Sequence, residues 1–221
     1  MERNLMQRTD ALVFIHKWVP AESVVSDPVT LLLLHGAGGD ENALLSVGKE
    51  LWPGAALLAL RGKVFENDGA SSFGRFTDAD MGDLKSRTEE LAQFIGAASK
   101  RYSFRKRRVI VVGYANGANL AASLILLHPH YLAAAVLFRA IVPLVPDLIR
   151  DFGHLSVFIG AARLDPLIPS GQPEELAALF ESGGADVTIS WHQGGRELGE
   201  DEIQAAKCWL AREKIRRRFA A

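Results

Sequence analysis

The residues that point most directly to chemistry lie in the stretch 108–120, RVIVVGYANGANL. An apolar run typical of a buried strand ends in GYANG, residues 113–117, and an apolar helical pattern follows at once. The pattern G-x-S-x-G at such a junction holds a serine hydroxyl on a strained turn, where it can attack a carbonyl carbon. Position 115 is alanine, which fits the turn but has no atom that can attack. The stretch therefore predicts the frame of an ester-cleaving site without its nucleophile.

The elements that must position these residues alternate along the chain. Short apolar runs typical of strands are separated by amphipathic stretches typical of helices, a pattern that favours a parallel sheet covered by helices. Residues 61–81 interrupt the pattern with a long loop that contains glycine and serine. The predicted strands are 11–16, 30–34, 55–60, 108–112, 133–138, 155–160 and 187–191, and the predicted helices are 40–51, 83–102, 118–127, 173–182 and 200–219. We expect one α/β domain over residues 1–221, with a mostly parallel central sheet.

Composition and charge limit the classes of function. The chain has 221 residues, 48% hydrophobic content and a formal charge of −1, which suits one well-packed domain and gives no general attraction to nucleic acid or to an acidic membrane surface. The basic runs 105–108 and 212–218 lack interleaved aromatic residues, so we interpret them as the solvated start of a strand and the positive end of a helix. We therefore expect no nucleic-acid partner and no membrane partner.

Cysteine and histidine usage indicates neither a disulfide framework nor a metal site. Cys208 is the only cysteine, and His128 and His130 flank a proline without a further group of ligands. The N-terminus lacks the basic start and apolar core of a signal peptide, and no apolar run is long enough to span a membrane. We expect a cytoplasmic protein with no cofactor and no metal.

Five blocks of the chain, taken in order, resemble the carboxylesterase/phospholipase family of α/β-hydrolases, and within it the small bacterial branch. The blocks are LLLLHGAGGDE, LRGKV, VVGYANGANLAASLILLHP, GAARLDPLIP and SWHQGGRELGEDEIQAAKCWL. The resemblance implies an α/β-hydrolase fold with helices on both faces of the sheet and no large cap domain. It also implies hydrolysis of a small ester or thioester by a serine, a histidine, a carboxylate and backbone N–H donors for the oxyanion.

The resemblance implies a role for each matching residue of this chain. Ala115 stands at the nucleophile position, Asp165 at that of the triad acid, and Arg196 at that of the triad histidine. A guanidinium stays protonated at any working pH, so Arg196 cannot act as a general base. His192 matches a non-catalytic position of the family. The oxyanion donors would be the N–H groups of Ala37 and Asn116, and the expected pocket residues are His35, Gly36, Phe73 and Tyr114.

Two classes of function remain open at this level. The first is a carboxylesterase-type hydrolase that is inactive or nearly so; the second is a pseudo-hydrolase that binds a small carboxylate or ester ligand, or pairs with an active partner subunit. The resemblance also allows a homodimer, which no residue of the sequence decides. We expect Arg196 to lie against Asp165 in a charge-assisted hydrogen bond that satisfies the buried carboxylate. The phenylalanines of the long loop, Phe65, Phe73 and Phe76, either line the pocket or pack into the core.

Overall fold

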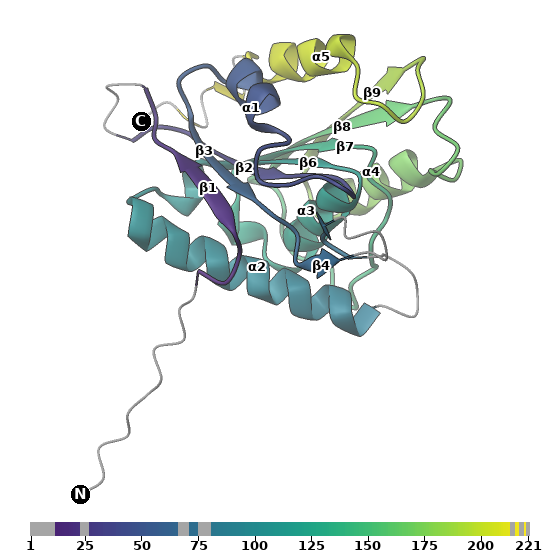
Figure 1. The fold of residues 1–221 in the computed structure, drawn as a ribbon. Helices are drawn as coiled ribbons and strands as arrows, with labels where there is room; N and C mark the ends of the chain where they lie inside the picture. The colour runs from purple at the N-terminus through teal and green to yellow at the C-terminus, as the bar shows by residue number, and fades with distance from the viewer. Residues whose placement is uncertain are drawn as a thin grey trace, which may run out of the picture.

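The computed structural model describes residues 12–22, 27–65, 71–74, 81–212, 215–216 and 219. It contains a seven-stranded sheet in the order β1-β3-β2-β6-β7-β8-β9 (Figure 1). Every neighbouring pair is parallel except the antiparallel pair of β1 with β3 at one edge, which confirms the predicted α/β architecture. The strands are β1 His16–Val19, β2 Thr30–Leu34, β3 Ala56–Leu60, β6 Val109–Tyr114, β7 Ala134–Phe138, β8 Ser156–Ala162 and β9 Asp186–His192.

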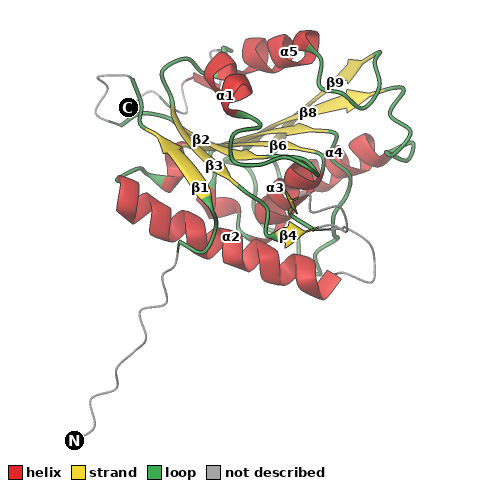
Figure 2. Cartoon of the chain, viewed as in Figure 1, coloured by secondary structure: helices red, strands yellow, loops and turns green. Residues whose placement is uncertain are grey.

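Helices cover both faces of this sheet. One face carries α1 (Leu45–Leu51) and α5 (Glu200–Leu210), and the other carries α2 (Met81–Tyr102), α3 (Asn116–Leu127) and α4 (Gln172–Ser182) (Figure 2). The central strands are almost entirely apolar, as expected for strands whose two faces are both buried. In β2, for example, Leu32 and Leu34 join the cluster beneath α2, α3 and α4, whereas Leu31 and Leu33 join the one beneath α1 and α5.

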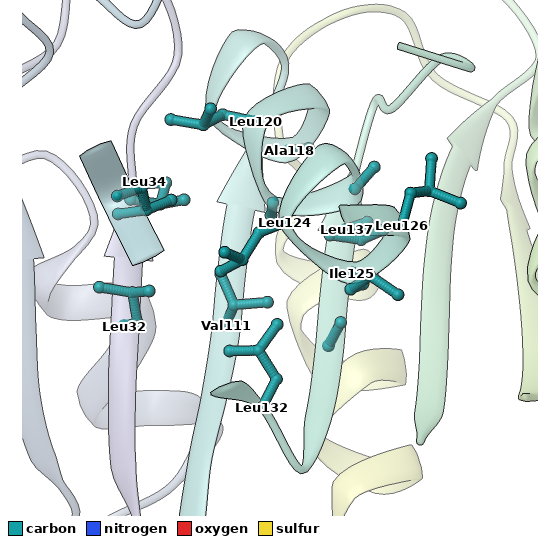
Figure 3. Packing of buried hydrophobic residues seen from close by; sticks show 14 of the residues in the cluster. Leu32, Leu34, Val111, Ala118, Leu120, Leu124, Ile125, Leu126, Leu132 and Leu137 are labelled. Carbon is teal, nitrogen blue, oxygen red and sulfur yellow. The ribbon is translucent and has the colours of Figure 1, made fainter. Parts of the chain in front are cut away.

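Helix α3 lies at the centre of the larger cluster and fixes the turn that precedes it. Its residues from Gly117 to Leu126 are all buried. Figure 3 shows Leu120 and Leu124 among side chains of β2, β6 and β7, such as Val111 and Leu137. Burying one leucine side chain stabilises a protein by about 1.5–3 kcal/mol, so the start of α3 is firmly held.

Three predicted elements have bounds that differ from the observed ones by more than two residues. The strand predicted at 11–16 begins only at His16, because pairing of β1 with β3 runs from His16 opposite Leu60 to Val19 opposite Leu57. The helix predicted from residue 40 begins at Leu45 after a turn. The helix predicted over 200–219 ends at Leu210, since Ala211 and Arg212 are not helical; a short helical piece returns at 215–216.

The loop predicted at 61–81 contains a two-stranded sheet of β4 (Val64–Phe65) and β5 (Ser71–Ser72). Residues 66–70 and 75–80, including Phe76, lie outside the described residues. Helix α2 then begins at Met81, close to the predicted start.

Candidate active site

The turn between β6 and α3 keeps the geometry of a nucleophile elbow at an alanine. Ala115 has φ 49° and ψ −115°, a backbone conformation that residues other than glycine rarely adopt. Its N–H donates to the carbonyl of Phe138 (2.9 Å), and its own carbonyl accepts from the N–H of Asn119 (3.0 Å). The end of β7 and the first turn of α3 thus hold the elbow from both sides.

The two glycines of GYANG are required by close backbone packing. A Cβ atom on Gly113 would lie 2.6 Å from the Cα of Ala118, and one on Gly117 would lie 2.1 Å from the carbonyl oxygen of Leu34. Real Cβ atoms do not approach so closely, so only glycine lets α3 start directly against β6 and β2. The spacing of these glycines is the local cause of the sharp turn at position 115.

The loop after β2 is held by the imidazole of His35. The ring Nδ1–H donates to the carbonyl of Gly36 (2.5 Å), and Nε2 accepts from the N–H of Gly62 (2.9 Å). Burial lowers the pKa of His35 from its ordinary value and outweighs the opposing effect of the Gly36 carbonyl. Both ring nitrogens therefore serve the loop, and the neutral ring has a structural role.

The predicted oxyanion donors are available to a ligand. In the described part of the chain, the N–H groups of Ala37 and Asn116 donate no hydrogen bond to any other group. Asn116 is the first residue of α3, where an N–H has no partner within the helix and the helix dipole favours negative charge. The side chain of Asn116 donates to Ser72 Oγ (3.0 Å), which ties the elbow to β5.

Asp165 lies just after β8, as predicted, but its partner differs from our expectation. Its side chain is fully buried, and its Oδ1 accepts the N–H of Leu167 (2.9 Å). Its Oδ2 has no hydrogen bond and lies 3.7 Å from Nε of Arg139, a distance that makes an ion pair but no hydrogen bond. Among the described residues, the ionic partner of Asp165 is thus Arg139.

The prediction that Arg196 pairs with Asp165 is wrong. Within residues 12–22, 27–65, 71–74 and 81–212, the half-buried Arg196 side chain forms no ion pair within 4.0 Å. Its backbone carbonyl accepts from Oη of Tyr114 (2.7 Å), which places this loop beside the elbow. Arg139, not Arg196, pairs with Asp165 because Arg139 directly follows β7, and β7 is the neighbour of β8 in the sheet.

Sequence reasoning missed Arg139 and its partner Glu202. The guanidinium donates to both carboxylate oxygens of Glu202, at 2.7 Å for Nη2 to Oε2, and both side chains are almost fully buried. Burial acts to lower the pKa of Arg139, but Glu202 more than offsets this, so the pKa is raised from its ordinary value. Two signals were present: an arginine directly after the apolar run AAAVLF, and a glutamate three residues after Gly199, the spacing of a capping box.

A cleft of about 360 Å³ adjoins the predicted oxyanion loop. Three of the four predicted pocket residues line it, and Phe73 is not among its lining residues. Phe73 is 2% exposed and packs on the His35 ring with centroids 4.8 Å apart, as in the alternative in which it belongs to the core. Most of the lining is apolar: His35, Gly36, Ala37, Gly39, Ala43, Leu44, Val47, Tyr114, Glu197, Leu198 and Ile203.

Other polar side chains near the site are already engaged. His192 Nδ1 lies 2.6 Å from Oδ2 of Asp201, and its Nε2 lies 4.0 Å from Glu202. Ser71 Oγ donates to the carbonyl of Gly39, and Ser72 Oγ accepts a hydrogen bond from the side-chain amide of Asn116.

Among the residues whose placement is described, no three His, Cys, Asp or Glu side chains are grouped so as to hold a metal ion. The described helices include none with the length and apolarity needed to cross a membrane.

The sheet order, the elbow after β6, the buried aspartate after β8 and the glycine-containing loop after β2 match the arrangement of an α/β-hydrolase of the carboxylesterase type. Residues 60–196 match the dienelactone hydrolase family, and the chain belongs to that family. The chain is 42% identical over 190 residues to MhqD of Bacillus subtilis, a protein named as a hydrolase; the match covers 85% of this chain and 94% of MhqD.

Solved structures agree with this placement. The chain superposes on a carboxylesterase from Bacillus cereus with a TM-score of 0.84 and 38% identity, covering 89% of this chain and 93% of that one. A carboxylesterase from Mesorhizobium loti gives a TM-score of 0.80 and 29% identity, covering 92% and 96%. The shared fold therefore extends over nearly the whole chain.

Proposed function

We propose that this protein binds small carboxylate or ester ligands at the former catalytic site and hydrolyses esters or thioesters very slowly or not at all. The observation that carries the proposal is the backbone of Ala115, which has the positive φ of an elbow nucleophile although the side chain is a methyl group. Strain of this kind costs about 1–3 kcal/mol and persists only where the surrounding structure imposes it. The frame of the site is thus present without its nucleophile.

The absence of turnover follows from the chemistry of acyl transfer. That reaction needs a nucleophile and a base that takes its proton. Ala115 offers no nucleophile, the guanidinium of Arg196 stays protonated, and both ring nitrogens of His35 are occupied. Binding and oxyanion stabilisation alone give a serine protease about 10³–10⁴ over the rate in water, which is little above background for an ordinary ester.

Preference for an anionic ligand is supported by the groups that remain. The N–H donors of Ala37 and Asn116 are unoccupied in the described structure, and Arg196 has no ionic partner there. The charge of Arg139, by contrast, is balanced by the carboxylates of Glu202 and Asp165, so Arg139 would add little attraction for an anionic ligand. Charge-assisted hydrogen bonds are about twice as strong as neutral ones, so Arg196 would favour a carboxylate over a neutral ligand.

Pairing with a second copy is favoured by exposed apolar side chains near the site. Leu164 and Leu167, on either side of Asp165, are 71% and 63% exposed. Large apolar side chains exposed close together on a surface are typical of interaction sites. We therefore propose a homodimer that uses this surface.

Hydrolysis of a short-chain activated ester tests the proposal. The unmodified chain should show no turnover above background. Ala115→Ser combined with Arg196→His should raise the rate of ester hydrolysis about 10²–10⁴-fold above that background, the usual contribution of acid–base catalysis. The two single variants are the matched controls, and each should remain inactive because a nucleophile without a base, or the reverse, does little.

The outcomes separate the two classes of function. Turnover by the unmodified chain would disprove the proposal and would require another nucleophile. A double variant that stays inactive, while the unmodified chain binds butyrate, would mean that the pocket serves binding and is no longer shaped for hydrolysis.

A further inference from the structure

The loop that carries residue 196 is held by one buried side chain. We propose that Arg139 is a positioning residue: it holds residues 195–197 against the elbow and thereby determines where the side chain of residue 196 lies. The inference rests on the proposed function only in treating residue 196 as a ligand contact.

Three successive carbonyl groups of this loop are bound from the sheet side. Nη2 of Arg139 donates to the carbonyls of Gly195 and Glu197, both at 3.0 Å, and Oη of Tyr114 donates to the carbonyl between them, that of Arg196 (2.7 Å). The peptide groups on both sides of residue 196 are therefore fixed. Tyr114 ends β6 and Arg139 follows β7, so two neighbouring strands set the position of the loop.

Arg139 is itself held from three directions. Its backbone has φ 58°, and its N–H donates to the carbonyl of Gly160 in β8 (2.9 Å). Both of its Nη atoms bind Glu202 of α5, whose Oε2 also accepts the N–H of Gly199 (3.1 Å). The side chain is 0% exposed. This arrangement joins β7, the loop and the start of α5 into one unit.

Only an arginine can make this set of contacts. Its planar guanidinium presents five N–H donors in a rigid fork, whereas lysine offers one compact ammonium on a flexible stem. A lysine at position 139 would keep the charge beside Glu202 but could not reach that carboxylate and two loop carbonyls together. The contacts thus point to a role in geometry as well as in charge balance.

A role in positioning must be separated from a role in stability. Removing Arg139 alone would leave the Glu202 and Asp165 carboxylates buried without a cation, which is strongly destabilising. The combination of Arg139→Met with Glu202→Gln and Asp165→Asn avoids this, because both carboxylates are replaced by neutral amides and the glutamine can still accept the N–H of Gly199. This variant keeps the cap of α5 but leaves the Gly195 and Glu197 carbonyls without their donor.

The test compares the full chain with Arg139→Met/Glu202→Gln/Asp165→Asn, called here the Met/Gln variant, and with Arg139→Lys. A matched control, Lys63→Met/Glu90→Gln, removes a surface ion pair whose side chains are each 35% exposed. Three quantities are measured: the melting temperature, the hydrogen exchange of the segment 193–199 relative to α4, and the dissociation constant for butyrate.

In the Met/Gln variant we expect exchange of 193–199 to become about tenfold faster and butyrate binding about tenfold weaker, while α4 keeps its protection because local opening need not follow global unfolding. For both the exchange rate of 193–199 and the dissociation constant for butyrate, the lysine variant should lie between the Met/Gln variant and the unmodified chain. The surface control should match the unmodified chain in both quantities.

Two results would overturn the proposal. Unchanged exchange of 193–199 in the Met/Gln variant would show that Arg139 does not hold the loop. Equal acceleration in α4 and in 193–199 would show that it is a general stabiliser only. If the unmodified chain binds no butyrate, the proposed function fails, but the exchange data still decide the role of Arg139.

Discussion

Arg196 and Arg139 differ in what their surroundings leave free. The guanidinium of Arg139 is buried: its Nη atoms bind Glu202 and loop carbonyls, and its Nε lies 3.7 Å from Asp165 without a hydrogen bond. Arg196 is half-buried and has no ionic partner among the described residues. At the scale of single residues, the buried arginine is paired within the fold, whereas the half-buried one has the unpaired guanidinium that the proposed ligand contact requires.

Replacing Arg196 should therefore weaken ligand binding and leave stability almost unchanged. In Arg196→Gln we expect the dissociation constant for butyrate to rise about tenfold, since a hydrogen bond to a charged group contributes about 1.5–3 kcal/mol. Calorimetric titration measures this change, and a urea melt checks stability. Arg150→Gln, at an exposed site without such a role, is the matched control. Equal affinity of the Arg196 variant and the unmodified chain would contradict the prediction.

His35 should make the stability of the protein depend on pH. Its pKa in the folded state lies below the ordinary value of 6.5, so below about pH 6.5 the unfolded chain binds a proton that the folded chain resists. The stabilisation is therefore present above pH 6.5 and is lost as pH falls, with a slope of up to about 1.4 kcal/mol per pH unit.

Urea unfolding between pH 8 and pH 5 tests this dependence. We expect the free energy of unfolding to fall less steeply in His35→Gln than in the unmodified chain, although the variant is less stable at pH 8. His130→Gln, which changes an exposed histidine, should keep the original slope. Identical slopes in all three proteins would contradict the assignment of a neutral, buried His35.

At the scale of secondary structure, the elbow depends on how closely α3 approaches β2. Gly117→Ala would put a methyl group 2.1 Å from the carbonyl of Leu34, and backbone atoms on both sides cannot easily move. We expect a loss of more than about 2 kcal/mol in the free energy of unfolding, as is usual for overpacking against a rigid backbone.

Gly96→Ala is the matched control for this substitution. Gly96 lies within α2, where an added Cβ meets only Tyr131 Cε1 at 4.0 Å. Alanine there should stabilise the protein by about 0.5–1 kcal/mol because glycine is a poor helix former. Denaturant midpoints measure both effects. A Gly117→Ala variant as stable as Gly96→Ala would contradict the packing argument.

At the scale of the whole molecule, the proposed homodimer should have twice the mass of a single chain in solution. Light scattering should find a particle of twice the chain mass of 24.1 kDa. Leu164→Lys combined with Leu167→Lys should shift it to a single chain, because buried lysines would lack partners in the interface. Val13→Lys, at another exposed apolar site, is the control and should leave the mass unchanged. A single-chain mass for the unmodified protein would contradict the proposal.

The sequence by itself determined the order of the main strands and helices and the elbow at 113–117, and its resemblance to a family singled out Asp165. The first two follow from local patterns: apolar runs, helical periodicity, and glycines that only a sharp turn requires. The same reasoning failed at the ends of elements. It put the first strand too early, because the length of β1 is set by its pairing with β3 and not by its own residues.

Only the tertiary structure decided which charges meet. Arg139 and Glu202 are 63 positions apart, and nothing in either local pattern names the other. The prediction that Arg196 would pair with Asp165 followed from the family pattern of the site. In the folded sheet β7 lies beside β8, and Arg139 directly after β7 therefore lies next to Asp165. The partner of a buried charge depends on which strands are neighbours in the folded sheet. An unpaired charge is costly in the low-dielectric interior, and only a group on a neighbouring element is close enough to pair with it.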